Sequence, residues 1–87
     1  MDTGFKLSNH AIERLASRHI DLDQVMFVIL APDRVIVLDS RLLIYQKSIV
    51  EEEKHYLYRV FVNVEADPKL IVTAYKTTKL EKYENQI

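Results

Sequence analysis

Cysteine is absent from the 87 residues of this sequence, and glycine occurs once, as Gly4. Without cysteine the chain has no disulfide framework, no thiolate nucleophile and no cysteine-based zinc site. A single glycine excludes a phosphate-binding loop and a dinucleotide-binding fingerprint, because each needs several glycines at fixed spacing. The chemistry of the protein must therefore come from other side chains, and the lack of cysteine suits a reducing cytoplasm.

Long apolar segments are also missing. Residues 1–6 contain no apolar run of the kind that forms a signal peptide. The longest uncharged apolar stretch, 25–31, is much shorter than the roughly 20 residues of a membrane-spanning helix. We therefore expect a cytoplasmic protein with no membrane partner.

Neither sign of charge dominates, since 12 lysines and arginines stand against 13 aspartates and glutamates and give a net charge of −1. The content of 48% hydrophobic and 29% charged residues indicates a folded chain, and the length fits one domain, 1–87, with a modest core. The total charge does not point to nucleic acid. Acidic residues gather at 51–53 and at Asp21 and Asp23, however, so the basic residues elsewhere are able to form a local patch.

Two helices are expected in the helical part of the chain, 5–31, after a short extended lead-in. Ser8 is a good N-cap for a helix that runs to about Arg18. The second helix begins at Asp21, with Gln24 completing a capping-box pattern, and Pro32 ends it.

Four β-branched and aromatic runs follow in the segment 34–79, before a polar tail, 80–87, that we expect to form a frayed helical turn. The runs are 34–38, 42–50, 56–64 and 70–77. Short connections between them predict an antiparallel meander. The predicted fold class is α+β, with two N-terminal helices packed on one face of a four-stranded antiparallel meander sheet.

Alternation along the strands assigns residues to the two faces of this sheet. The sides expected to meet the helices are apolar and consist of Tyr58, Val60, Val62 and Val64 in the third strand and Leu70, Val72 and Ala74 in the fourth. The opposite, partly open face would carry Arg59, Ile71, Thr73 and Tyr75, together with Tyr45 and Lys47. Such a face suits an extended ligand or a partner chain.

A polar row on the first helix is the main candidate for chemistry. His10, Arg14 and Arg18 recur every fourth residue, which places them along one side of a helix. The opposite side is expected to hold Ile12, Leu15, Ala16 and His19. The first turn of a helix carries partial positive charge, which favours a neutral, proton-accepting His10 and also attracts phosphate.

A second polar set alternates along the last strand and leads into the tail: Thr73, Tyr75, Thr77, Lys79 and Tyr83. Arg59 interrupts an otherwise apolar strand, so its guanidinium needs a carboxylate partner or a ligand. Such arginines either bind phosphate oxygens or form ordinary ion pairs. Tyrosines in strands either stack on bases or pack against the protein itself. The sequence leaves both alternatives open. Its three histidines are not spaced as a metal pair, so we expect no metal and no cofactor.

A set of motifs extends along the chain from Phe5 to Tyr83: Ser8-x-His10-Ala11-x-x-Arg14-x-x-x-Arg18-x-Ile20, a second helix ending at Pro32, Tyr58-Arg59-Val60, Val72-Thr73-Ala74-Tyr75 and Lys79-x-x-x-Tyr83. In these motifs the sequence resembles a widespread family of small bacterial proteins of unassigned function. That family lies near the RelE-type toxins, in the superfamily of barnase-like and colicin-type ribonucleases.

This resemblance implies a RelE-like fold and a toxin-like endoribonuclease that cleaves RNA without a metal. In such enzymes a ribose 2′-hydroxyl attacks the adjacent phosphorus, which requires a base, an acid and cations. The residues matched to catalysis are His10, Arg14, Arg59 and Tyr75, and those matched to RNA binding are Arg18, Lys47, Thr73, Lys79 and Tyr83.

An antitoxin protein that neutralises the enzyme is the implied partner, besides RNA. RelE-type toxins are usually basic, and the near-neutral charge of this chain departs from that pattern, which argues against ribosome-dependent cleavage. The alternative function is a non-catalytic module of the same fold that binds protein or nucleic acid. A homodimer formed through sheet edges is a further hypothesis.

Overall fold

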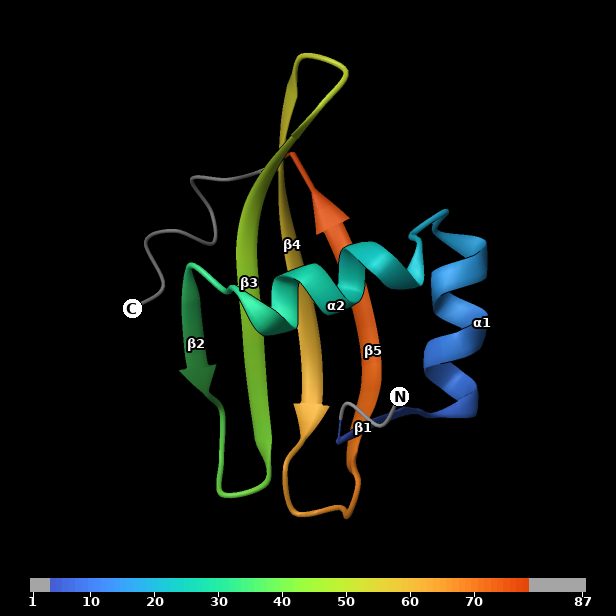
Figure 1. The fold of residues 1–87 in the computed structure, drawn as a ribbon, viewed down its shortest axis with the longest axis vertical. Helices are drawn as coiled ribbons and strands as arrows, with labels where there is room; N and C mark the ends of the chain where they lie inside the picture. The colour runs from blue at the N-terminus through green and yellow to red at the C-terminus, as the bar shows by residue number, and fades with distance from the viewer. Residues whose placement is uncertain (1–3, 79–87) are drawn as a thin grey trace.

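The fold is built around a five-stranded mixed sheet with two helices, as Figure 1 shows for the computed structural model, which describes residues 4–78. In chain order the elements are β1 (Phe5–Leu7), α1 (Asn9–Ser17), α2 (Leu22–Leu30), β2 (Arg34–Val37), β3 (Leu42–Glu51), β4 (Lys54–Asn63) and β5 (Lys69–Thr77). The strands lie in the order β1-β5-β4-β3-β2.

The prediction of a four-stranded antiparallel meander is wrong, because a fifth strand joins the sheet in parallel. Strands β2 to β5 pair antiparallel with their chain neighbours, whereas β1 pairs parallel with β5 and aligns Phe5 with Lys69 and Leu7 with Ile71. The segment expected to be a lead-in is therefore β1. A strand of three residues is too short to show an alternating pattern in the sequence.

Helix α1 begins at the predicted cap, where Ser8 Oγ accepts the N–H of Ala11 at 2.9 Å. Its buried residues are Ala11 and Leu15, while Ile12, Ala16 and His19 are exposed, so the predicted apolar side is wrong for three of its four members. The helix flanks β5 rather than crossing the centre of the sheet (Figure 1). One narrow row of buried side chains is therefore enough to pack it against the sheet.

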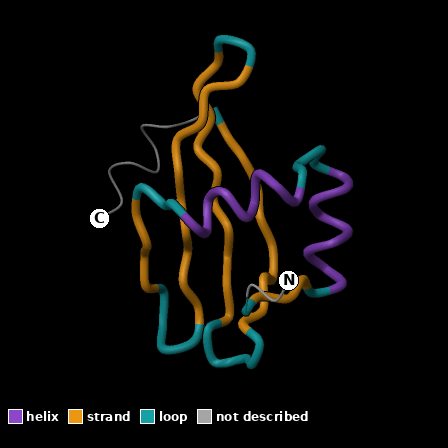
Figure 2. The backbone as a smooth tube through the Cα atoms, viewed as in Figure 1, coloured by secondary structure: helices purple, strands orange, loops and turns teal. Residues whose placement is uncertain are grey.

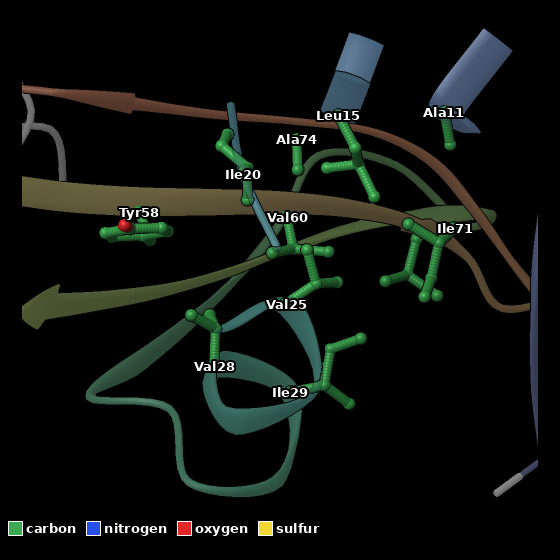
Figure 3. Packing of buried hydrophobic residues seen from close by; sticks show 11 residues of the cluster. Ala11, Leu15, Ile20, Val25, Val28, Ile29, Tyr58, Val60, Ile71 and Ala74 are labelled. Carbon is green, nitrogen blue, oxygen red and sulfur yellow. The ribbon is translucent and has the colours of Figure 1, made fainter. Parts of the chain in front are cut away.

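Helix α2 crosses one face of the sheet in front of its central strands (Figures 1 and 2). Gln24 Oε1 accepts the N–H of Asp21 at 3.1 Å, as the capping pattern predicted. The core between helices and sheet contains Ala11, Leu15, Ile20, Val25, Val28, Ile29, Tyr58, Val60, Val62, Ile71 and Ala74, of which Figure 3 labels ten. The valine-rich side of β4 faces the helices, as predicted.

An irregularity in β5 overturns two assignments of faces. Phe61 pairs with Thr73 but Val62 pairs with Ile71, so Val72 is an extra residue in β5. Ile71 is turned toward the helices by this bulge and is only 1% exposed. The prediction that Ile71 lies on the open face is therefore wrong. So is the prediction that Leu70 faces the helices, because Leu70 is aligned with Asn63, which shares the open face with Arg59.

Strand register corrects a second assignment. Tyr45 is aligned with Val60, and Lys47 with Tyr58, and both of these β4 residues belong to the core between sheet and helices. Residues aligned in neighbouring strands project from the same face. Tyr45 and Lys47 thus lie on the helix-covered face, not on the open face as predicted.

Candidate functional site

Arg59 is the centre of a polar cluster on the sheet face turned away from the helices. The register aligns it with Gln46 on β3 and with Tyr75 on β5. Its Nε donates to Gln46 Oε1 at 3.2 Å, and its Nη1 donates to Tyr75 Oη at 2.8 Å. Because Arg59 is only 6% exposed, these contacts hold its charge in one position.

Aromatic rings flank this guanidinium. The rings of Phe61 and Tyr75 are tilted by 33°, with centroids 6.0 Å apart. The guanidinium carbon of Arg59 lies 5.8 Å from the Phe61 centroid and 5.9 Å from that of Tyr75, within the range of cation–π attraction. Sequence reasoning identified Arg59 and Tyr75 but missed Gln46 and Phe61, which a correct strand register would have found.

Arg18 extends this cluster toward α1. Its Nη1 donates to the carbonyl of Ala74 at 2.8 Å and lies 3.4 Å from Thr73 Oγ1. Thr73 and Tyr75 are alternate residues of β5 and share the open face. The structure therefore places four predicted site residues, Arg18, Arg59, Thr73 and Tyr75, along one band. We call this band the Arg59 face.

His10 and Arg14 form a separate pair on α1. Arg14 Nε donates to His10 Nε2 at 3.3 Å, which confirms that the two lie in one row of the helix. Both side chains are exposed. Within residues 4–78, no hydrogen bond or ion pair connects either of them to Arg59 or Tyr75. The expected convergence of His10 with Arg59 is therefore not seen in these contacts.

Lys47 lies apart from the other candidates, on the helix-covered face. Its Nζ donates to the carbonyl of Ala31 at 2.7 Å, forms an ion pair with Asp33 at 3.4 Å and lies 5.0 Å from the centroid of the Phe27 ring. These contacts secure the end of α2. The two remaining candidates, Lys79 and Tyr83, and the predicted helical turn of the tail lie outside the described residues.

A cavity of about 250 Å³ opens on the same side of the sheet as the Arg59 face. Its lining consists of Asp33, Arg34, Gln46, Ser48 and Leu57. Gln46 belongs both to this lining and to the contacts of Arg59, so the cavity adjoins the Arg59 face. The lining is mixed in charge, with Asp33 accepting the N–H of Ser48 at 2.9 Å.

A second polar cluster, around Glu51, lies on the helix-covered face and was missed by sequence reasoning. Its carboxylate accepts hydrogen bonds from Gln24 of α2 and Tyr58 of β4, and Lys76 of β5 lies 3.0 Å away. The bond from Tyr58 holds the pKa of Glu51 below its ordinary value; Lys76 and Gln24 act in the same direction, and partial burial opposes them. Burial raises the pKa of Tyr58, and the Glu51 carboxylate raises it further.

The Glu51 cluster borders a cavity of about 370 Å³, which is also lined by His19, Asp21, Glu52 and Tyr56. No pattern in the sequence indicated this cluster, because its members come from four different elements, and Gln24 and Lys76 are each at least 25 residues from Glu51. Among residues 4–78, histidine, aspartate and glutamate side chains form no group of three or more suited to a metal ion.

Neither helix of the described part is long and apolar enough to cross a membrane. No curated protein and no solved structure matches the sequence. The family described as "Domain of unknown function (DUF4258)" matches residues 7–76, from the last residue of β1 to the last residue but one of β5. This match covers most of the chain and includes both helices and the Arg59 face. The protein belongs to the DUF4258 family.

Proposed function

We propose that the protein is a toxin-like, metal-independent ribonuclease that acts in the cytoplasm, cleaves RNA through the ribose 2′-hydroxyl and is neutralised by an antitoxin. The observation that carries the proposal is the Arg59–Tyr75 pair, in which a fixed guanidinium donates to a tyrosine hydroxyl at 2.8 Å. Transfer of a phosphoryl group needs positive charge where the phosphorane forms and a group that exchanges a proton with the leaving oxygen. Arg59 supplies the first and Tyr75, as acid, the second, while the attacking 2′-hydroxyl forms its bond to phosphorus, the bond to the 5′-oxygen breaks, and the proton of the 2′-hydroxyl passes to solvent water.

Neighbouring side chains fit an RNA strand bound along the Arg59 face. Phe61 and Tyr75 offer aromatic surface against which a base stacks, a contact that tolerates any sequence. Arg18 and Thr73 would bind the backbone on the side of α1. His10 and Arg14 lie beyond them and would hold a further phosphate at the first turn of the helix, where partial positive charge attracts anions.

The test is cleavage of single-stranded RNA by the purified protein in excess EDTA. We expect products with a cyclic phosphate and a free 5′-hydroxyl. Tyr75→Phe keeps the ring against Phe61 and removes only the hydroxyl, so it should lower the rate by roughly 10²–10⁴. Tyr45→Phe, on the helix-covered face, is the matched control and should cleave at the wild-type rate.

Two results would contradict this proposal. The first is an absence of cleavage by the wild-type protein, or cleavage only when a divalent metal is added. The second is a Tyr75→Phe variant that cleaves as fast as the control. Equal thermal midpoints of the two variants would establish that any difference in rate does not come from unfolding.

A non-catalytic module that binds nucleic acid or protein through the same face is the second candidate function. Two observations favour it. The balance of 12 basic against 13 acidic residues gives the chain no general attraction for RNA. In addition, Arg18 and Arg59 already bind groups of the protein itself. Stable binding of a labelled RNA without any cleavage would select this function over the first.

A further inference from the structure

Strand β2 forms the outer edge of the sheet, with β3 as its only neighbour among the described strands (Figure 1). The N–H of Leu38 donates to the carbonyl of Leu42 on β3. Inward and outward backbone groups alternate along an antiparallel strand, so those of Val35 and Val37 point away from β3. No hydrogen bond within residues 4–78 occupies these outward groups.

The other edge of the sheet, at β1 and β5, is covered. Beyond the three residues of β1, the outer edge of β5 is covered by α1 and the residues that flank it. Ser8 donates to the carbonyls of Ile71 and Val72, and Arg18 donates to that of Ala74. Proteins commonly block exposed strand edges with charges, prolines or covering elements. β2 begins with a charged residue, Arg34, but residues 35–38 after it carry no charge and no proline. Within residues 4–78, no such device therefore blocks the outward edge of this stretch.

An apolar patch accompanies the open edge. Val35 and Val37 are aligned with Tyr45 and Leu43, on the helix-covered side of β2. The last turns of α2 lie over β3, beside β2 (Figure 1). The exposed apolar side chains at this end of the molecule are Phe27 and Leu30 from the last turns of α2, Val35 and Val37 of β2 and, on the other face of the same edge, Leu38, with exposed fractions from 42% to 73%. We call these five residues the β2 patch.

We infer that the β2 patch is the interface at which a second copy of this chain binds, by antiparallel pairing of the two β2 strands about a twofold axis. With Ile36 of each copy at the axis, Val35 of one protomer lies opposite Val37 of the other, and the reverse holds on the other side of the axis. Their outward backbone groups then complete each other's hydrogen bonds. Both sheets join into one, and this inference does not depend on the ribonuclease proposal.

Self-complementarity and area favour a second copy as the occupant. A twofold pairing places apolar valines against apolar valines and needs no complementary charge from a different protein. The net charge of −1 produces little repulsion between copies. The five side chains expose on the order of 500 Å², within the range of about 300–600 Å² for the largest patch on a typical monomer. Two such patches, with the paired backbones, approach the total of about 1,200 Å² at which stable interfaces begin.

The experiment measures the mass of the full chain in solution, by sedimentation, from micromolar to near-millimolar concentration. We expect a reversible rise from the monomer mass of 10.2 kDa to twice that value. Val37→Lys, which places a charge on the edge in both copies, should raise the dissociation constant by at least about tenfold. Val50→Lys, at an exposed valine of β3 outside the β2 patch, is the matched control and should dimerise like the wild type.

Ile36→Cys tests the register, since the chain has no other cysteine. Under mild oxidation this variant should form a disulfide-linked dimer, because residues facing each other at the twofold axis come within disulfide distance. Val50→Cys should remain monomeric under the same conditions. A wild-type chain that stays at monomer mass throughout, or a Val37→Lys variant that dimerises as well as the control, would overturn the inference.

Discussion

Removal of the Glu51 charge tests how the helices are held on the sheet. Glu51→Gln keeps the size of the side chain and its ability to accept a hydrogen bond from Tyr58, but it removes the negative charge. An amide also presents a donor toward Lys76, which itself can only donate. The contact of 3.0 Å between Lys76 and Glu51 is therefore lost, and the bonds from Gln24 and Tyr58 lose their charge-assisted strength.

The expected loss of stability follows from the exposure of each partner of Glu51. Tyr58 is fully buried, so weakening its bond from charge-assisted to neutral costs about 1 kcal/mol. The side chains of Lys76 and Glu51 are 25% and 21% exposed, and an ion pair so near the surface contributes about 0.5 kcal/mol. We expect Glu51→Gln to lower the free energy of unfolding by about 1–2 kcal/mol at neutral pH, which for a domain of this size lowers the thermal midpoint by roughly 4–16 °C.

The loss of stability in Glu51→Gln should depend on pH, and the lowered pKa of Glu51 determines the direction of this dependence. A carboxyl whose pKa is lower in the folded state stabilises the fold above its unfolded pKa, about 4.3, and this contribution disappears as the pH falls through the folded value. Urea unfolding at neutral pH and at about pH 3 measures the difference between wild type and Glu51→Gln. We expect a clear difference at neutral pH that shrinks on acidification.

The matched control is Glu53→Gln, in the exposed turn of the same hairpin, which should change stability by less than about 0.5 kcal/mol. An equal difference between wild type and Glu51→Gln at both pH values would refute the electrostatic argument. So would a Glu51→Gln variant that is as stable as Glu53→Gln at neutral pH, since the Glu51 cluster would then contribute nothing beyond its shape.

Three further variants test the fold by thermal and urea unfolding. Ser8→Ala removes the cap of α1 and the contact with Val72, and should cost about 1 kcal/mol, whereas Ser17→Ala at the exposed end of the helix should cost little. Arg18→Met removes the bond to the Ala74 carbonyl and should cost about 1–2 kcal/mol; an unchanged midpoint would show that this contact does not secure α1. Ile71→Ala should cost about 2–5 kcal/mol because the side chain is buried, and a loss below 1 kcal/mol would contradict its placement in the core.

Local signals predicted the elements of this chain well. The cap at Ser8, the Gln24 contact that begins α2 and the four strands of the meander are each specified by neighbouring residues, and the strand bounds differ from the predicted ones by at most two residues. Such features depend on local backbone chemistry, which the sequence contains directly.

Features that depend on distant contacts were missed. Strand β1 exists because β5, more than sixty residues later, offers it an edge. The bulge at Val72 lies in a run whose two alternating sides both begin with apolar residues, so no pattern marks the extra residue. The faces of Tyr45 and Lys47 followed from a register that only the pairing of β3 with β4 defines.

The same distinction explains what was found of the candidate site. Arg59 was recognisable because it interrupts an apolar strand, and Tyr75 because it belongs to an alternating polar set. Gln46 and Phe61 could be assigned to the candidate site only once the register of the strands was known. His10 and Arg14 were identified correctly as a pair by helical spacing, but spacing within α1 carries no information on which part of the sheet the pair faces.

The two polar clusters lie on opposite faces of one sheet, and their chemistry differs accordingly. Around Glu51, three elements besides its own supply donors to a single carboxylate, which is an arrangement that fastens α2 to the sheet. Arg59 forms hydrogen bonds with Gln46 and Tyr75, which lie on the two neighbouring strands. Backbone hydrogen bonds already join these strands, so the two side-chain bonds attach no further element to the sheet. A buried guanidinium contributes little stability compared with an apolar residue of similar size. Stability therefore gives a reason for the cluster around Glu51, because its bonds join a helix to the sheet, whereas the bonds of Arg59 to Gln46 and Tyr75 join strands that are already paired.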